Sequence, residues 1–324
     1  MVLGKKEETA RRPINLATTT FILLCLGSIS SALAIDEKRK TSDLSAALVD
    51  AQRSAKIQKF CQEQRNSFKE LKWSIDPCDG AEWQIGGTSV KSRPLVYAEF
   101  GNPQSKNSTL IVSMVHGDEI TPMYLSAQIA KWLKDNKDLL ADAHVILAPL
   151  VNPDSFLHKP RSRTNSRGVD VNRNFGTKDW DRLAKQAWKK RYGANPRRFP
   201  GNAPDSEPET RFQKELIDKF QPQKVLAIHA PLNFLDYDGP NMLSLHKFPK
   251  EYVAECLRLR QAIKAEHSHY YPGSLGNYAG RERGIPTITL ELPSADPRKG
   301  DKFWQEFKPG LRTMIDYKVQ PAGG

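Results

Sequence analysis

The stretch "STLIVSMVHGDEI" (Ser108–Ile120) decides the class of fold. Its apolar residues run from Leu110 to Val115 almost without alternation, which is typical of a strand that is buried on both faces of a sheet. The run stops at His116, and a glycine and two carboxylates follow at once. The stretch therefore predicts a buried strand whose carboxyl end carries polar side chains capable of chemistry.

Three more apolar runs have the same character, and patterns with helical spacing separate them. These runs are "AHVILAPL" (Ala143–Leu150), "KVLAIH" (Lys224–His229) and "IPTITLEL" (Ile285–Leu292). Buried strands that alternate with helices predict an α/β fold, with a mixed, mostly parallel twisted sheet and helices on both of its faces. In such sheets the functional site lies at the carboxyl ends of the strands.

The boundaries of several helices can be predicted from capping residues. Thr121 precedes Pro122, which predicts a helix with the threonine as its N-cap and the proline at its first position. "SEPE" (Ser206–Glu209) has the spacing of a capping box and predicts a helix that ends before Pro222. A further long helix is predicted near residues 249–267.

The N-terminal residues have the three parts of a secretory signal peptide. Two lysines and two arginines precede an apolar stretch around "FILLCLG" (Phe21–Gly27), and "SALA" (Ser31–Ala34) provides small residues for cleavage. We therefore expect residues 1–34 to be removed on export, which places the protein in the periplasm or outside the cell without stable membrane insertion. The alternative is a membrane anchor, because residues 14–34 are just long enough to span a bilayer.

Two segments are expected after cleavage. Residues 35–80 have apolar positions at roughly helical spacing, including Leu48, Phe60, Phe68 and Leu71, and predict an amphipathic helical extension that packs on the main domain. "DPCDG" at residues 76–80 is a turn that marks the boundary, and residues 81–324 form the catalytic domain.

Charge and cysteine content limit the partners and the compartment. The chain of 324 residues carries a formal net charge of +12, and an exported basic protein meets anionic wall polymers or membrane surfaces rather than nucleic acid. Charge for solubility alone is the alternative, and the basic stretch Lys189–Phe199 is expected to be a solvated insertion. An oxidising compartment permits a disulfide between Cys61 and Cys78, the closest pair, and leaves Cys256 free. The sequence gives no indication of the oligomeric state.

Histidine and carboxylate residues stand at three of the predicted strand ends. His116 and Glu119 follow the first strand, and Gly117 lets the backbone bend between them. His229 ends the third strand, and Glu291 lies in the fourth. Zinc in hydrolases takes three protein ligands of these types and keeps one position for water, and His116, Glu119 and His229 would supply such a set for one Zn²⁺ ion. Taken alone, the first pair can equally belong to a polar turn, and Glu291 to a solvent-facing position on an alternating strand.

A polar and basic block follows the second strand. It is "NPDSFLHKPRSRTNSRGVDVNRNF" (Asn152–Phe175), which contains Arg163, Asn172 and Arg173. Guanidinium groups match carboxylates in a bidentate manner, and asparagine adds directional hydrogen bonds. The block is suited to binding an anionic substrate group, although composition alone favours a basic surface loop.

Five segments in this order resemble the zinc carboxypeptidase family of the carboxypeptidase A type. They are "HGDE", "NPD", "RTNSRGVDVNRNF", "AIHAPLNFLDYDGP" and "TLELP", and the resemblance covers about residues 83–295. It includes the family's opening strand pair at residues 85–102. It implies a zinc-dependent hydrolase in which His116, Glu119 and His229 match the zinc ligands and Glu291 matches the general base.

The resemblance also assigns the residues that contact the substrate. Arg163 matches the arginine that polarises the scissile carbonyl, and Asn172 and Arg173 match the pair that holds the terminal carboxylate. The family has a mobile tyrosine over the site, for which three residues compete: Tyr270, Tyr271 and Tyr278. Asp118 matches none of these roles and is expected to orient a ligand or to close the turn.

Within that family, "HAPLNFLDYDGP" and "PGSLGNYAG" are most similar to bacterial murein peptide amidases, which cut the bond between γ-D-glutamate and meso-diaminopimelate in peptidoglycan peptides. The resemblance implies such peptides as substrates. Asp236 and Asp238 are expected to pair with the diaminopimelate ammonium, or else to form only a turn with the glycine and proline that follow.

Three other functions compete with this hypothesis. A zinc acyl-amidase of the succinylglutamate desuccinylase type shares the histidine–glutamate pair and an Asp-x-Asn-Arg element, and a D,L-carboxypeptidase or general secreted carboxypeptidase uses the same site on other bonds. The remaining class is a non-catalytic module that binds wall peptides. Such a module would normally have lost a metal-ligand residue or the general base.

Overall fold

The computed structural model describes Met1, Asp43 and residues 45–239 and 271–319. The chain divides into two compact units, Met1–Ala55 and Lys56–Gly324, and the described part of the first unit is helical from residue 45 to residue 55. The predicted signal peptide after Met1, the predicted helix near residues 249–267 and Cys256 lie outside the described residues. Within the described ranges no helix combines the length and the apolar character needed to cross a membrane.

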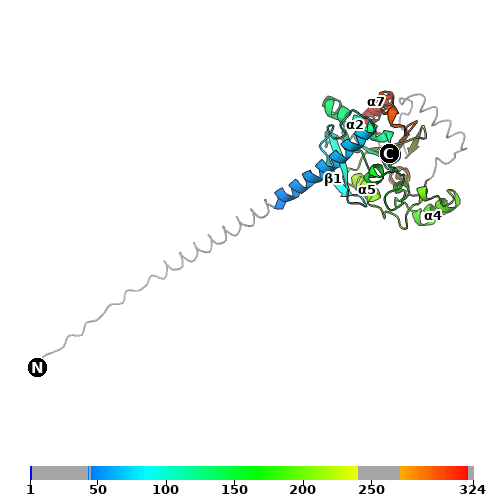
Figure 1. Ribbon diagram of the computed structural model, residues 1–324, viewed down its shortest axis with the longest axis horizontal. Helices are drawn as coiled ribbons and strands as arrows, with labels where there is room; N and C mark the ends of the chain where they lie inside the picture. Colours follow the sequence, from blue (N-terminus) through cyan, green and yellow to red (C-terminus); the bar gives the residue numbers. More distant parts are fainter. Residues whose placement is uncertain (2–42, 44, 240–270, 320–324) are drawn as a thin grey trace, which may run out of the picture. The chain divides into compact units, whose positions relative to one another are not determined.

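The second unit is built on one sheet of seven strands in the order β1-β2-β4-β3-β5-β7-β6. Figure 1 shows the ribbon of this unit, coloured along the sequence. The strands are β1 (Gln84–Thr88), β2 (Pro94–Gly101), β3 (Ser108–Ser113), β4 (His144–Ala148), β5 (Lys224–His229), β6 (Phe234–Asp238) and β7 (Thr287–Glu291). The four central strands β4, β3, β5 and β7 are parallel, whereas β1, β2 and β6 pair antiparallel with their neighbours.

The predicted fold class is confirmed. Every residue of β3, β4 and β5 is buried, which explains why these runs do not alternate between apolar and polar residues. The opening strand pair is present as β1 and β2. Strand β6 was not predicted, because its two aspartates and the Gly-Pro after it are typical of a turn.

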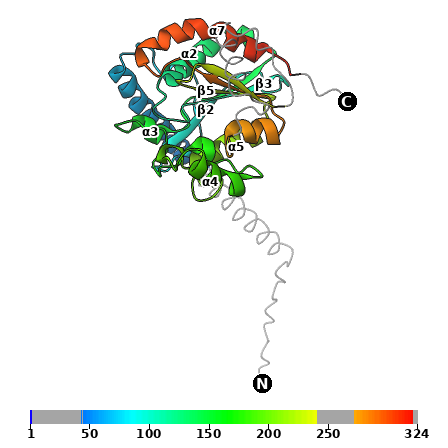
Figure 2. The same cartoon turned by 90° about the vertical axis from the view of Figure 1, so that its right-hand side faces the viewer.

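Helices cover both faces of the sheet (Figure 2). On one face α2 (Thr121–Asp135) packs beside α7 (Gly300–Asp316), and on the other lies α5 (Pro208–Phe220). The short helices are η1 (Lys137–Leu140), α3 (Pro153–Leu157), η2 (Val171–Arg173), α4 (Trp180–Lys190), η3 (Pro196–Arg198), η5 (Gly276–Glu282) and η6 (Pro297–Lys299). The sheet is thus buried between two apolar cores, and its carboxyl edge is left to the loops.

The predicted N-cap of α2 is wrong by one residue. Ile120 is the N-cap and makes no side-chain capping bond, whereas Thr121 is already helical. The Thr121 hydroxyl donates instead to the carbonyl oxygen of Ser294 at 2.6 Å. Pro122 lies in the first turn, as predicted. A tertiary partner has therefore replaced the local one that the sequence favoured.

The predicted capping box of α5 is also wrong. Glu207 is the N-cap without a side-chain capping bond, and the Ser206 hydroxyl donates to the Glu207 carboxylate at 2.7 Å. Glu209 accepts from the side chain of Asn165 at 3.0 Å and from the backbone N–H of Val90 at 3.2 Å. The helix ends at Phe220, before Pro222, as predicted.

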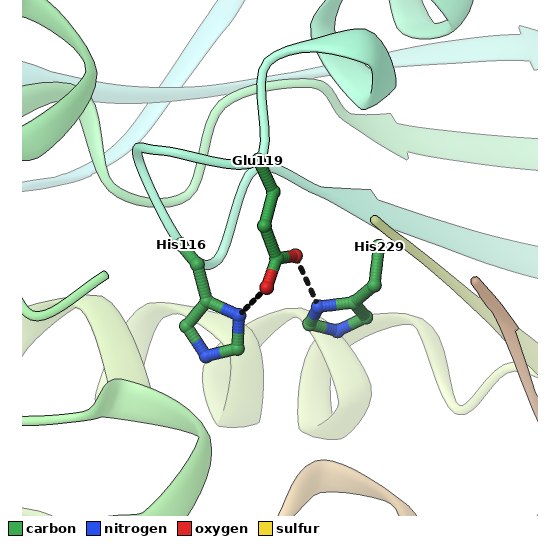
Figure 3. A group of neighbouring side chains, drawn as sticks. All are labelled: His116, Glu119 and His229. Atoms are coloured by element: carbon green, nitrogen blue, oxygen red, sulfur yellow. Dashed lines mark hydrogen bonds and ion pairs between the residues drawn. The ribbon is translucent and has the colours of Figure 1, made fainter. Parts of the chain in front are cut away.

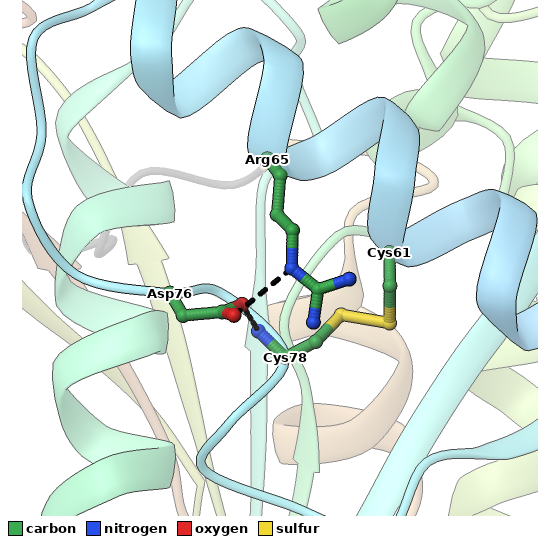
Figure 4. Close-up of a disulfide and its surroundings, with 4 residues drawn as sticks. All are labelled: Cys61, Arg65, Asp76 and Cys78. Atoms are coloured by element: carbon green, nitrogen blue, oxygen red, sulfur yellow. Dashed lines mark hydrogen bonds and ion pairs between the residues drawn. A yellow bond between two sulfur atoms is a disulfide. The ribbon is translucent and has the colours of Figure 1, made fainter.

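A disulfide joins Cys61 and Cys78, the pair that the sequence favours (Figure 4). Residues 56–70 are helical, and Phe60 and Phe68 are buried in the core under α2 and α7. The guanidinium of Arg65 donates to Asp76 at 2.9 Å. Leu48, in the first unit, is 59% exposed.

Candidate metal centre

Residues at the carboxyl ends of three parallel strands lie close together. His116 follows β3 after a bend at Met114, whose φ of 54° is left-handed and ends the strand. His229 is the last residue of β5 and Glu291 the last of β7, and these two residues are directly paired across the sheet. The prediction that the site lies at the carboxyl ends of the strands is consistent with this placement.

His116, Glu119 and His229 form a buried cluster (Figure 3). The Nδ1 atom of His116 lies 2.6 Å from one oxygen of the Glu119 carboxylate, and Nδ1 of His229 lies 2.8 Å from the other. Burial would raise the pKa of Glu119, but the two neighbouring imidazoles hold it below its ordinary value, so the carboxylate stays charged. Two imidazoles and a carboxylate therefore face one point.

Gly117 is required by close packing rather than by an unusual φ. A Cβ atom at this position would lie 2.5 Å from the backbone nitrogen of Phe156 and 2.6 Å from Cβ of Ser155. The expected reason for this glycine was a bend in the backbone, and the structure gives a different one. Helix α3 packs against the His116–Glu119 turn so tightly that no side chain fits between them.

Asp170 links the histidine to the arginine loop, and sequence reasoning did not single it out. One carboxylate oxygen lies 3.1 Å from Nε2 of His116, and the other accepts from Nε of Arg163 at 2.8 Å. Burial would raise the pKa of Asp170, but Arg163 and His116 hold it well below the usual value. A charged partner at Nε2 fixes the ring so that Nδ1 faces the cluster. The spacing Asp-x-Asn-Arg was the available signal.

The donor set fits a zinc ion. The candidate ligand atoms of His116, Glu119 and His229 lie within 4.8 Å of one another, and all three residues are buried. Three nitrogen and oxygen ligands, with one histidine anchored through its second nitrogen, are the usual protein half of a catalytic zinc site.

Residues 79–304 match the family model described as zinc carboxypeptidase. The chain belongs to the zinc carboxypeptidase family. It is therefore a hydrolase, and the family implies zinc as its metal.

Among its relatives are murein peptide amidases. Murein peptide amidase A of Escherichia coli K12 is 29% identical over 240 residues, which are 73% of this chain and 90% of that protein. The protein of the same name from Vibrio campbellii is 30% identical over 217 residues, 65% of this chain and 79% of that one.

Solved structures share the fold. Bovine thrombin-activatable fibrinolysis inhibitor, in complex with tick carboxypeptidase inhibitor, matches with a TM-score of 0.58 at 15% identity, over 80% of this chain and 95% of that one. Carboxypeptidase A of Helicoverpa armigera matches with a TM-score of 0.53 at 20% identity, over 78% of this chain and 71% of that one. These two structures support the predicted fold class.

The remaining predicted residues line one pocket. Asn172 accepts from the backbone N–H of Leu275 through Oδ1 at 2.9 Å, which fixes its amide. The guanidinium of Arg173 donates to the carbonyl oxygen of Asn172 at 2.6 Å and stacks 4.5 Å from the ring centre of Tyr271. The structure therefore brings Arg163, Asn172 and Arg173 together with both histidines and Glu291.

Glu291 is 7% exposed and lines this pocket. Burial, together with the nearby negative charge of Glu119, raises its pKa to about 7. One of its oxygens lies 3.4 Å from the backbone nitrogen of Leu232, which follows the cis peptide bond between Ala230 and Pro231. The carboxyl group is therefore held in place and can exchange a proton near neutral pH.

The structure places both aspartates of β6 in the lining of the pocket and separates the candidate tyrosines. Asp238 accepts from Nε of Arg281 at 2.8 Å. Tyr271 lines the pocket, while Tyr278 stacks on Phe175. Tyr270 lies outside the described residues, so within the described part of the chain Tyr271 is the candidate for the tyrosine over the site.

The segment predicted as a solvated insertion contributes to the wall of the zinc carboxypeptidase site. Arg197 pairs with Asp118 at 2.8 Å, and the carbonyl oxygen of Phe199 accepts from the backbone N–H of Asp170 at 2.8 Å. Arg198 lines the pocket. The expectation holds for Lys189, Lys190 and Arg197, which are exposed, and is wrong for Arg198 and Phe199, which are half-buried. Asp118 contacts this segment, which its sequence context did not indicate.

Proposed function

We propose that this protein is an exported, zinc-dependent amidase that hydrolyses peptidoglycan peptides at the bond between γ-D-glutamate and meso-diaminopimelate. The observation that carries the proposal is the meeting of a two-histidine, one-carboxylate cluster, a buried glutamate and a pair of carboxylate-binding side chains in one pocket. The similarity to murein peptide amidases over 90% of the length of one of them supports the substrate class.

The proposed metal ligands of this single ion are His116, Glu119 and His229. When bound, zinc lowers the pKa of a water molecule and polarises a carbonyl group. Glu291 acts as the general base that takes the proton of the attacking water and passes it to the leaving amine. A pKa of about 7 suits both transfers, because the carboxylate accepts a proton near neutral pH without retaining it.

The basic side chains of the pocket position the substrate. The Nδ2 group of Asn172 and the guanidinium of Arg173 hold the terminal carboxylate, since Oδ1 of Asn172 is already bonded to Leu275. Holding that carboxylate places the bond before the last residue next to Glu291. Arg163 stabilises the negative charge that develops on the scissile oxygen, an interaction worth about 3 kcal/mol in comparable sites.

The side chain of diaminopimelate carries an ammonium group, and Asp236 and Asp238 are proposed to bind it. Both line the pocket. Asp238 also pairs with Arg281 at 2.8 Å, which orients its carboxylate. Export to the periplasm or the exterior places the protein where such peptides occur, in keeping with the N-terminal sequence pattern.

The test is cleavage of purified muropeptides by the zinc-loaded protein, with the products separated by chromatography. We expect a cut that a chelator abolishes and zinc restores, and that Glu291→Gln lowers by at least about a thousandfold while zinc stays bound. Glu215→Gln, an exposed change on α5, is the matched control and should cut normally. Release of diaminopimelate from the tripeptide supports an amidase. Trimming only at another bond supports a D,L-carboxypeptidase, and no cut in any wall peptide refutes the substrate class.

A further inference from the structure

One cationic side chain of the pocket has no role in the proposed function. Arg198 belongs to η3 and lines the same pocket as Arg163 and Arg173. It is half-buried, and among the residues that the structure describes no carboxylate pairs with it. Arg163, by contrast, pairs with Asp170 through Nε and with Glu119 through Nη1.

Arg198 is held in place by its surroundings. Its guanidinium carbon lies 4.8 Å from the ring centre of Tyr192, and its backbone N–H donates to the carbonyl oxygen of Asn195 at 3.0 Å. The next residue, Phe199, packs on Trp188 with ring centres 5.0 Å apart. A side chain fixed by stacking and by its backbone loses little conformational entropy when it binds a ligand.

The electrostatic surroundings of Arg198 favour an anion. Burial, followed by the positive charges of Arg163 and Arg173, lowers the pKa of Arg198, although the group stays protonated. Arg173 also has no carboxylate partner among the described residues, and its Nε is buried without a hydrogen bond. Two unpaired guanidinium groups in one pocket exceed what a single terminal carboxylate requires.

We propose that Arg198 binds a second carboxylate of the substrate, in addition to the terminal carboxylate assigned to Asn172 and Arg173. The inference rests on the proposed function and deepens it. A wall peptide offers two sources of this group: the distal carboxylate of diaminopimelate, and the free α-carboxylate of the γ-linked glutamate. An ordinary peptide with an apolar last residue offers neither, so Arg198 would select acidic wall peptides.

The experiment compares kcat/KM of the zinc-loaded wild type and of Arg198→Gln on three peptides. The first is L-alanyl-γ-D-glutamyl-meso-diaminopimelate; the second has L-lysine in place of diaminopimelate and lacks the distal carboxylate. The third has D-isoglutamine in place of D-glutamate and lacks the α-carboxylate. Arg182→Gln is the matched control, because it removes the same charge from an exposed site on the neighbouring helix α4.

We expect Arg198→Gln to lower kcat/KM on the first peptide about 10- to 100-fold, which is the effect of losing one hydrogen bond to a charged group. Arg182→Gln should leave kcat/KM unchanged. The loss should vanish on the one peptide that lacks the contacted carboxylate, which identifies the source. Titration of the first peptide into the Glu291→Gln background, with and without Arg198→Gln, should show the same loss in affinity without turnover. Arg198→Lys should retain part of the effect, and it replaces the glutamine variant if that variant does not fold.

Two results would overturn the assignment. One is an unchanged kcat/KM and affinity for Arg198→Gln on the first peptide. The other is an equal loss on all three peptides, because that pattern reports a disturbed pocket rather than a lost carboxylate contact. If the wild type cleaves none of the three peptides, the proposed function is refuted, and the proposed binding of a substrate carboxylate by Arg198 is refuted with it. Cleavage by the wild type with no effect of the variant refutes the role of Arg198 alone.

Discussion

Asp170→Asn is the change that most directly tests how the metal centre is supported. Asparagine keeps the size of the side chain and one acceptor oxygen, but it removes the negative charge. In the structure that charge is shared between Nε2 of His116, 3.1 Å away, and Nε of Arg163, 2.8 Å away. The substitution therefore weakens the anchor of a candidate ligand and one of the two ion pairs of Arg163, without changing a candidate ligand atom.

The magnitude follows from these two contacts. Loss of a charged partner behind a metal-binding histidine typically lowers metal affinity about 10- to 100-fold, or about 1.4 to 2.8 kcal/mol. Burial of Asp170, whose side chain is 0% exposed, argues for the upper part of that range, because solvent screens the contact little. At saturating zinc, kcat/KM should still fall by about tenfold or more, since Arg163, the proposed stabiliser of the scissile oxygen, loses one of its two carboxylate partners.

Zinc affinity is measured by competition with a chromophoric chelator, and kcat/KM is measured on the same samples. Asp154→Asn is the matched control, because Asp154 is equally buried and pairs with Arg93 at 2.8 Å, yet it is not among the residues lining the pocket. Asp154→Asn should lower the unfolding free energy and leave zinc affinity unchanged. Wild-type zinc affinity in Asp170→Asn, or equal zinc loss in both variants, would show that Asp170 does not support the site.

Three further changes test other parts of the structure. Replacing Cys61 and Cys78 together by serine should lower the unfolding free energy in urea by about 3 kcal/mol, the closure entropy of the 17-residue separation, and an unchanged midpoint would contradict this. Burial lowers the pKa of Lys224 to about 7 from 10.5, so between these values the unfolded chain binds the extra proton and stability rises with pH. The free energy of unfolding of the Lys224→Met variant should lack this rise. The stability of the variant relative to the wild type should therefore fall by about 1.4 kcal/mol per pH unit from about pH 7 to 10. If the unfolding free energies of the two proteins change in parallel with pH, the lowered pKa of Lys224 is refuted. Gly117→Ala should lower both thermal stability and zinc affinity, because its Cβ would lie 2.5 Å from the backbone of α3, and normal zinc binding at a normal melting temperature would count against it.

The strands and the metal-site candidates could be predicted because their signals are local. An apolar run without alternation defines a buried parallel strand, and the residue that interrupts it marks the carboxyl end. His116, His229 and Glu291 were found in this way, and the parallel register then brings them together without further information. Glu119 follows from its spacing to His116. The resemblance to a known family added the roles of these residues rather than their positions.

Contacts between distant parts of the chain could not be predicted in the same way. The Ser206–Glu209 segment has a capping-box pattern, but Glu209 is bonded to Asn165 and Val90, which lie far from it in sequence. Asp170 resembled any polar loop residue until His116 was placed beside it. In both cases a buried partner with a strong hydrogen-bonding requirement prevailed over a local propensity.

Asp118 and Glu119 show how far two adjacent acids can diverge. Glu119 turns inward, where its carboxylate lies between two imidazoles, and Asp118 turns outward to Arg197 at 2.8 Å. That outward pair ties the turn holding a candidate zinc ligand to the segment holding Arg198, and Phe199 binds the backbone of Asp170 from the same segment. A substrate carboxylate bound at Arg198 would therefore bind the same segment that contacts Asp118, next to Glu119, and Asp170, the partner of His116. Arg197 is 58% exposed, so its own pair contributes little to stability, and the main effect of breaking it should be on substrate binding rather than on folding.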